Sequence, residues 1–236
     1  MDKVRVDMAM VRTSRHEATQ SLLGDTIGIT DEQWNQPSRL PGWTRAHVAT
    51  HLARNADAFV RIMEQLRGHK PTRLYASETD RREEIERGSE RTALELQVDL
   101  DASAGRLHTH LPELMKLPPD RLVHLTPTLT QRLERLPIAR LNEVVLHHID
   151  LDVGFSYHNI ENHVASWLLS FNADRIGRNS AYPAIRIVAD SGLTVVIGGP
   201  GHPGLVHGAD NFLLCWLTGR LPEGDAGAKM PLLPCL

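Results

Sequence analysis

The chain has 236 residues, 41% hydrophobic and 23% charged, a composition typical of a globular protein with a packed core. Its 26 basic and 29 acidic residues give a net charge of −3, which excludes the strong positive field that non-specific nucleic-acid binding requires. Cys215 and Cys235 are too few for a disulfide framework and favour a reducing compartment. Because the sequence shows neither a signal peptide nor a membrane-length apolar run, we expect a cytoplasmic protein that binds neither membranes nor nucleic acid.

The first part of the chain predicts two helices. Apolar residues recur at helical spacing over residues 4–27, which predicts a long first helix. A turn-forming segment rich in proline and glycine follows over residues 36–43. Thr44 then stands at the N-cap position of a second helix, and Gly68 stands where that helix should end.

Two more helices are predicted before residue 155. Residues 69–80 have the composition of a loop, and residues 81–110 are dense in charge with spaced apolar residues, which predicts one continuous third helix. Several prolines then interrupt the chain. The fourth predicted helix begins at Pro137, a residue suited to a first helical turn, and ends at Gly154.

The pattern changes after the fourth helix. Residues 163–177 have a helical pattern, whereas residues 184–190 and 193–199 contain short β-branched runs. The turn residues Asp190-Ser191-Gly192 separate these runs, which predicts a β-hairpin. A loop rich in glycine and proline leads to a last predicted helix over residues 211–220.

This change near residue 160 predicts two domains. We expect a four-helix bundle over residues 1–158 and a small α+β domain over residues 159–236 that contributes to a substrate cleft. The predicted fold class is therefore α+β.

The fourth predicted helix is apolar around most of its circumference and is expected to be buried. Its polar stripe consists of Arg140, Glu143, His147 and Asp150. Such groups need partners when they are buried. Glu143 and His147 are one helical turn apart, so one ion can contact both, whereas His148 points away and is the weaker ligand candidate. The second helix carries a matching stripe of Thr44, His47, His51 and Asn55.

If these two helices are neighbours, His51 completes a His₂-carboxylate set with Glu143 and His147. Catalytic zinc sites use this composition and leave one position open for water or substrate. Other interpretations are that Glu143 pairs with Arg140, that His51 is a hydrogen-bonded core histidine, or that His47 and His51 form a separate metal-binding pair.

Three separated segments resemble one known family. Residues 40–52, LPGWTRAHVATHL, are similar to the Pro-Gly-Trp-Ser/Thr signature and following His-Leu of the DinB-like metal-binding bundles. Residues 139–154, ARLNEVVLHHIDLDVG, resemble the E-x₃-H-H-x-D-L segment of their mycothiol-dependent branch. Residues 212–220, FLLCWLTGR, resemble the C-terminal domain of that branch, the mycothiol-dependent maleylpyruvate isomerases. Residues 69–136 carry no matching motif.

The resemblance implies that His51, Glu143 and His147 are zinc ligands and that Arg220 is a functional arginine of the second domain. It implies Zn²⁺ and mycothiol as cofactors, and a cis-trans isomerase that converts maleylpyruvate to fumarylpyruvate in gentisate-type aromatic catabolism. The mycothiol thiolate would add to the cis double bond and be eliminated after rotation. Arg220 would hold a carboxylate of the dicarboxylate substrate, and Arg81 and Arg82 are weaker candidates for that role.

Two other functions remain open from the sequence. A mycothiol S-transferase would use the same metal and thiol but release the adduct, so it would consume thiol. The small α+β domain also resembles sterol-carrier-like folds, so a non-catalytic ligand-binding or zinc-sensing module is the other alternative. A His₂-carboxylate set also suits Fe(II), Ni(II) or Co(II). His47 and Asp150 are candidates to orient the ligands.

Overall fold

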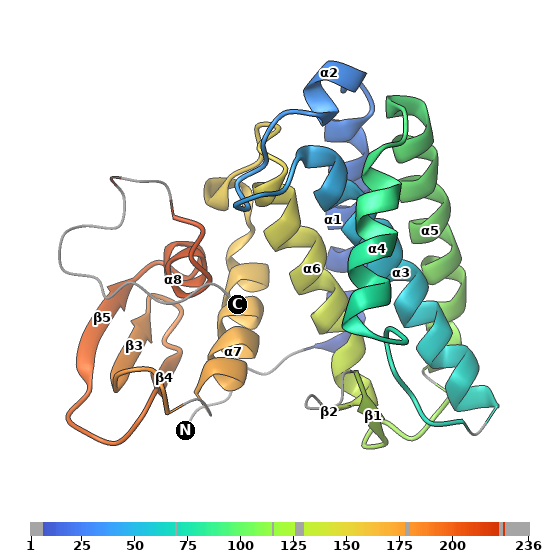
Figure 1. The fold of residues 1–236 in the computed structure, drawn as a ribbon. Helices are drawn as coiled ribbons and strands as arrows, with labels where there is room; N and C mark the ends of the chain where they lie inside the picture. The colour runs from blue at the N-terminus through green and yellow to red at the C-terminus, as the bar shows by residue number, and fades with distance from the viewer. Residues whose placement is uncertain are drawn as a thin grey trace. The chain divides into compact units, whose positions relative to one another are not determined.

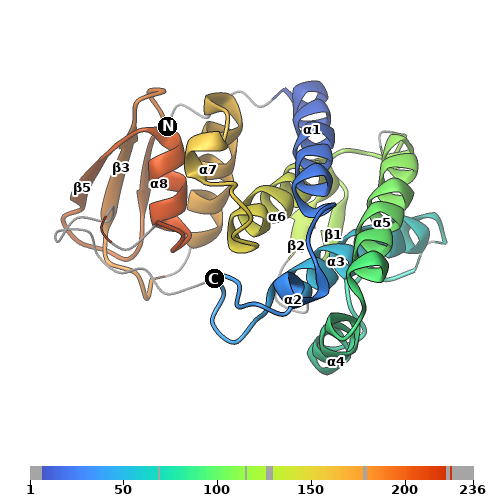
Figure 2. The same cartoon turned by 90° about the horizontal axis from the view of Figure 1, so that it is seen from above.

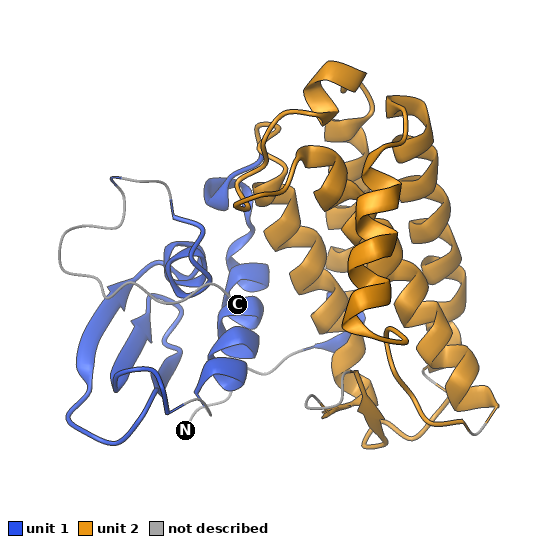
Figure 3. Ribbon diagram, in the orientation of Figure 1, with its two compact units in different colours: residues 1–11, 155–236 blue, residues 12–154 orange. Residues whose placement is uncertain are grey.

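The computed structural model describes residues 7–68, 70–114, 116–125, 130–177, 180–221 and 224. These residues form two compact units, shown in different colours in Figure 3. The helical unit comprises residues 12–154, and the sheet unit comprises residues 155–236 together with residues 1–11. Cys235 and the predicted helical residue Val4 lie outside the described ranges.

Four long helices dominate the helical unit (Figure 1). They are α1 (Met8–Thr26), α3 (Arg45–Arg67), α5 (Ala93–Leu114) and α6 (Leu136–Asp150). The shorter elements are α2 (Asp31–Trp34), α4 (Glu78–Ser89), the antiparallel strands β1 (Leu122–His124) and β2 (Thr130–Arg132), and the 3₁₀ turn Leu133–Arg135. The predicted helical N-terminal region is therefore confirmed.

Helix α3 lies at the centre of the helical unit. It packs on α5, α4 and α6, and α1 and α4 lie on opposite sides of it (Figures 1 and 2). One buried cluster joins Leu52 of α3 to Leu22, Leu100 and Val144 of α1, α5 and α6. Burial of such side chains stabilises the unit by about 2 kcal/mol each. Helix α3 is thereby held on three sides, which fixes the direction of the residues it presents to α6.

The ends of α3 match the predicted ends. The Thr44 hydroxyl accepts a hydrogen bond from the His47 backbone amide at 3.4 Å, as expected of an N-cap. The amide of Gly68 donates to the Glu64 carbonyl at 3.0 Å and closes the last turn.

The single helix predicted over residues 81–110 is wrong, because the chain forms two helices there, α4 and α5. Ser77 caps α4 by accepting from the Asp80 amide at 3.0 Å. Thr92 begins α5 in the same way, and the Glu95 carboxylate accepts from the Thr92 amide at 2.9 Å. A threonine followed three residues later by glutamate is a sequence signal of a helix start. The prediction followed the periodicity of the apolar residues, which continues across this boundary, and therefore joined the two helices.

The sheet unit contains two helices and three strands. Helices α7 (Asn162–Ile176) and α8 (Asp210–Leu217) cover one face of the sheet formed by β3 (Ile185–Ala189), β4 (Thr194–Ile197) and β5 (Gly204–Gly208) (Figures 1 and 2). A short 3₁₀ turn, Tyr157–Asn159, precedes α7. The buried side chain of Cys215 lies in α8.

The predicted hairpin is present in the sheet unit. Strands β3 and β4 are antiparallel, with Val188 opposite Thr194, and Gly192 has a φ of 90° in the turn, which glycine adopts without steric cost. Asp210 at the start of α8 accepts from the Ser191 hydroxyl at 2.7 Å and ties the turn to that helix.

Strand β5 was not predicted. It pairs parallel to β3, so the strand order is β4-β3-β5. Its sequence, GLVHG, is short and bounded by glycines, which is a composition typical of loops. The segment forms a strand here because β3 supplies its hydrogen-bond partners. Among the described helices, none is both long and apolar enough to span a membrane.

Candidate metal centre

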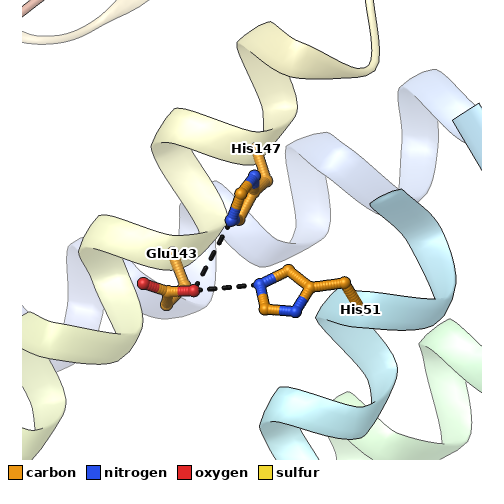
Figure 4. Close-up of side chains that lie close together, drawn as sticks. All are labelled: His51, Glu143 and His147. Carbon is orange, nitrogen blue, oxygen red and sulfur yellow. Dashed lines mark hydrogen bonds and ion pairs between the residues drawn. The ribbon is translucent and has the colours of Figure 1, made fainter. Parts of the chain in front are cut away.

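Helices α3 and α6 bring together side chains from two distant parts of the sequence. His51 lies in the second turn of α3 and is 4% exposed. Glu143 and His147 lie one turn apart on α6 and both face His51 (Figure 4). The second and fourth predicted helices are therefore neighbours, which is the condition under which His51 completes the set.

The ligand atoms of these residues converge. His51 Nε2 lies 3.1 Å from Glu143 Oε2, and His147 Nε2 lies 3.5 Å from the same oxygen. One nitrogen or oxygen atom from each residue falls within 4.8 Å of the others, so the three form a group that could hold a metal ion. The Glu143 side chain keeps 26% of its surface exposed, which leaves the group open on one side.

These distances fit a metal ion. Nitrogen and oxygen ligands about 2.1 Å from a tetrahedral zinc are roughly 3.4 Å from one another, close to the two distances measured at Glu143. Two imidazoles and one carboxylate also leave a fourth position for water or substrate. The residues therefore fit the implied metal in both donor type and spacing.

Asp150 orients one of the ligands. Its buried carboxylate accepts from His147 Nδ1 at 2.8 Å, so the proton of a neutral His147 lies on Nδ1 and the Nε2 lone pair faces the group. A carboxylate behind a ligating histidine is the usual support of such a ligand. The predicted orienting role of Asp150 thus has a geometric basis in the structure.

The pKa values of the three residues are shifted by different physical causes. Burial lowers the pKa of His51 to about 4, with the hydrogen bond to Glu143 opposing the shift. Desolvation acts to raise the pKa of Glu143, but hydrogen bonds from His147 and His51 outweigh it and hold that pKa well below its usual value. Burial acts to lower the pKa of His147, and the hydrogen bonds to Asp150 and Glu143 outweigh it, so that pKa is raised.

Arg140, the alternative partner predicted for Glu143, forms hydrogen bonds with other residues. The buried Arg140 guanidinium donates to Asn55 Oδ1 at 2.6 Å and to the Leu52 carbonyl at 3.0 Å. Arg140 and Asn55, members of the two predicted polar stripes, therefore satisfy each other and leave Glu143 to the histidines.

The other histidines of these helices point away from the group. His47 Nδ1 lies 2.7 Å from the Thr44 hydroxyl, and its Nε2 lies 3.3 Å from Glu86 of α4. His148 Nε2 lies 3.0 Å from Asp25 of α1. The structure thus directs His47 and His51 to different partners, and it directs His148 away from Glu143 as predicted.

The predicted arginines lie in different places. Arg220 follows α8 in the sheet unit, where its Nη1 donates to the Thr218 carbonyl at 3.0 Å. Arg81 of α4 reaches the metal-ligand group, with Nη2 3.4 Å from His51 Nδ1. Arg82 is exposed and lies outside the cavity that Arg81 lines.

Two aromatic residues join the surroundings of the group. The Trp43 ring, from the Pro-Gly-Trp segment, is centred 5.7 Å from the His51 ring. Tyr75 lies under the Arg81 guanidinium, whose carbon is 5.6 Å from the ring centre. Tyr75 was missed because it lies in the segment predicted only as a loop, and no periodic pattern singles it out.

Fold and site together define a helical bundle with a His₂-carboxylate group that could hold a metal ion, joined to a small sheet unit. Residues 15–152 match the family model described as the mycothiol maleylpyruvate isomerase N-terminal domain. The chain belongs to that family.

Two solved structures have the same fold over nearly the whole chain. One is a crystal structure of the mycothiol-dependent maleylpyruvate isomerase, and the other is of a histidine-to-alanine variant of that enzyme. Each has a TM-score of 0.86 and 21% sequence identity, and 98% of this chain and 98% of that chain are covered. No curated protein sequence matches the chain.

Proposed function

We propose that this chain is a zinc- and mycothiol-dependent cis-trans isomerase that converts maleylpyruvate to fumarylpyruvate in cytoplasmic, gentisate-type aromatic catabolism. The observation that carries the proposal is the convergence of His51, Glu143 and His147 within the family-matched region. The donor set and its spacing suit zinc, and the open side of the group gives a co-substrate access to the fourth position.

When bound, zinc would lower the pKa of a mycothiol thiol, whose thiolate adds to the cis double bond and leaves after the bond has rotated. The chain's own residues prepare this state. Because the pKa of His51 is about 4, the imidazole is neutral at neutral pH and offers its lone pair. Glu143 is ionised for the reasons given above, and Asp150 holds His147 in the tautomer that leaves Nε2 free.

The substrate is a dicarboxylate, so a cation is expected to bind one of its carboxylates. We propose Arg220 for this role on the basis of its position in the WLTGR run that resembles the family's C-terminal domain. Replacement of Arg220 by lysine keeps the charge but removes the two-pronged geometry. We expect the Michaelis constant for maleylpyruvate to rise in Arg220→Lys, while the Michaelis constant for mycothiol stays the same.

The first test is the metal content of the purified protein, measured by mass spectrometry. We expect about one zinc per chain in the wild type, and loss of zinc in His51→Ala, Glu143→Gln and His147→Ala. His47→Gln is the matched control, because His47 lies one turn from His51 but contacts Thr44 and Glu86. Full zinc retention in the three ligand variants would refute the proposed site.

The second test follows substrate and thiol together. An isomerase converts maleylpyruvate while the free thiol concentration stays constant, whereas a mycothiol S-transferase consumes one thiol per product. A non-catalytic module would bind ligand or zinc without turnover. Stoichiometric loss of thiol, or no conversion by the zinc-loaded protein, would therefore refute the isomerase proposal.

A further inference from the structure

Tyr75 lies on a wall shared by two cavities of the helical unit. A polar cavity of about 370 Å³ is lined by residues of α3, α4 and the segment before α4, among them Arg61, Arg81 and Tyr75. A second cavity of about 430 Å³ lies against the same segment and is also lined by Tyr75. A molecule in either cavity can therefore approach the Tyr75 side chain.

The Tyr75 hydroxyl is buried and has no hydrogen-bond acceptor in the described part of the chain, while the Arg81 side chain interacts with its oxygen as a donor. A buried polar group without a partner destabilises the folded state by about 1–3 kcal/mol, so such groups usually have a ligand or a functional reason. The ring itself is held by Arg81, whose guanidinium carbon lies 5.6 Å from the ring centre. Arg81 therefore holds the ring, and because a guanidinium has no acceptor, the hydroxyl proton is left to donate to another group.

Arg81 also links Tyr75 to the metal-ligand group. The same guanidinium that covers the Tyr75 ring places Nη2 3.4 Å from His51 Nδ1 and Nη1 2.9 Å from Glu78. The charges of Glu143 and Arg140 act on the Tyr75 phenol as well. One side chain thus separates Tyr75 from His51, and the hydroxyl lies in the electrostatic field of the group.

The Tyr75 hydroxyl is a donor at neutral pH. Burial raises the pKa of Tyr75 above its usual value, and the nearby positive charge of Arg81 only partly opposes this shift. The phenol therefore keeps its proton.

We propose that the Tyr75 hydroxyl is a catalytic hydrogen-bond donor to the substrate oxygen that gains negative charge during the reaction. This inference rests on the proposed function. When a thiolate adds to an alkene conjugated with a carbonyl, a C–S bond forms and the alkene electron pair moves onto the carbonyl oxygen as an enolate. Elimination returns the pair, breaks the C–S bond and releases the thiolate. Tyr75 keeps its proton throughout and stabilises the enolate by hydrogen bonding.

Arg81 acts as a positioning residue in this arrangement. A neutral His51 that gives its Nε2 lone pair to a metal carries its proton on Nδ1, so Nδ1 no longer accepts from Arg81. The guanidinium then keeps its contact with the Tyr75 ring and its ion pair with Glu78. Arg81 would therefore hold the ring in place in the zinc-loaded protein.

Tyr75→Phe tests the proposal, because it removes the hydroxyl and keeps the ring. We expect kcat to fall about 100-fold, with little change in the Michaelis constants or zinc content. Because the hydroxyl proton has no acceptor in the described part of the chain, we expect little change in the melting temperature. Tyr182→Phe, the same change in the sheet unit, is the control and should keep wild-type kcat.

A binding measurement without thiol gives a readout independent of turnover. Trans-4-oxopent-2-enoate keeps the conjugated carbonyl of the product, whereas fumarate lacks it. We expect Tyr75→Phe to weaken calorimetric binding of the oxo compound by about threefold to tenfold and to leave fumarate binding unchanged.

The outcomes separate the two proposals. Wild-type isomerisation with unchanged kcat in Tyr75→Phe would overturn the role of Tyr75 and leave the proposed function standing. A fall in kcat that accompanies zinc loss or a lower melting temperature would overturn the donor role in favour of a structural one. Absence of isomerisation in the zinc-loaded wild type would overturn the proposed function and the role of Tyr75 with it.

Discussion

The contact between Asp150 and His147 makes a quantitative prediction about metal binding. The buried Asp150 carboxylate accepts from His147 Nδ1 at 2.8 Å and helps to raise the pKa of His147. Asp150→Asn keeps the size of the side chain and an oxygen acceptor but removes the negative charge. Loss of such a supporting carboxylate costs about 10-fold to 100-fold in metal affinity, which corresponds to about 1.4–2.8 kcal/mol. We expect the zinc dissociation constant at pH 8 to rise by that factor.

The same substitution changes the pH dependence, and its sign follows from the pKa shift. Zinc binds a neutral histidine, so a protonated His147 must lose its proton first. Below the raised pKa of His147, the apparent zinc affinity of the wild type falls about tenfold per pH unit. In Asp150→Asn that pKa is lower, so the onset of this fall moves to lower pH. The variant is weaker at high pH and less sensitive to mild acid.

Competition titrations with a zinc chelator between pH 5 and pH 8.5 measure both effects. Asp152→Asn is the matched control, because Asp152 lies two residues further on and pairs with Arg39 and Arg45. It should keep the wild-type affinity and profile. The reasoning would be refuted if Asp150→Asn kept the wild-type dissociation constant and the wild-type onset of the fall.

Two further predictions concern the helices that carry the site. A Cβ atom at Gly88 of α4 would lie 3.0 Å from the Thr50 hydroxyl oxygen of α3 and closer still to its methyl group. Gly88→Ala should therefore lower the free energy of unfolding by about 1–3 kcal/mol. Thr50→Ala should restore the stability in the double variant. Equal stability of Gly88→Ala and the wild type in urea unfolding would contradict the close packing. Thr44→Ala removes the cap that accepts from the His47 amide and should lower the free energy of unfolding by about 1 kcal/mol. Thr44→Ser keeps a hydroxyl and should retain most of the stability. A melting temperature unchanged by the alanine substitution would argue against capping.

Much of the fold follows from local signals in the sequence. Thr44 and Gly68 mark the ends of α3 because capping depends on hydrogen bonds within a few residues of the chain. The antiparallel pairing of β3 with β4 follows from two short runs and a turn that glycine permits at Gly192. The spacing of Glu143 and His147 on one face of α6 follows from helical geometry alone.

Other features depend on contacts between distant segments. His51 meets Glu143 across 92 positions of the chain, and only the packing of α3 against α6 decides that distance. The residues of β5 become a strand because β3 supplies their hydrogen-bond partners. The availability of the Tyr75 hydroxyl depends on what surrounds it in three dimensions.

The sequence by itself determined helices α1, α3 and α6, the hairpin and the chemical types of the proposed metal ligands, because these depend on local hydrogen bonding and on the periodicity of side chains. The tertiary structure decided which polar groups satisfy one another: Arg140 pairs with Asn55, His47 faces Glu86, and His51 is left to Glu143 and His147. The reason is that a buried polar group pairs with whichever partner packing brings within hydrogen-bond distance. Local sequence does not specify the distance between segments that are far apart in the chain.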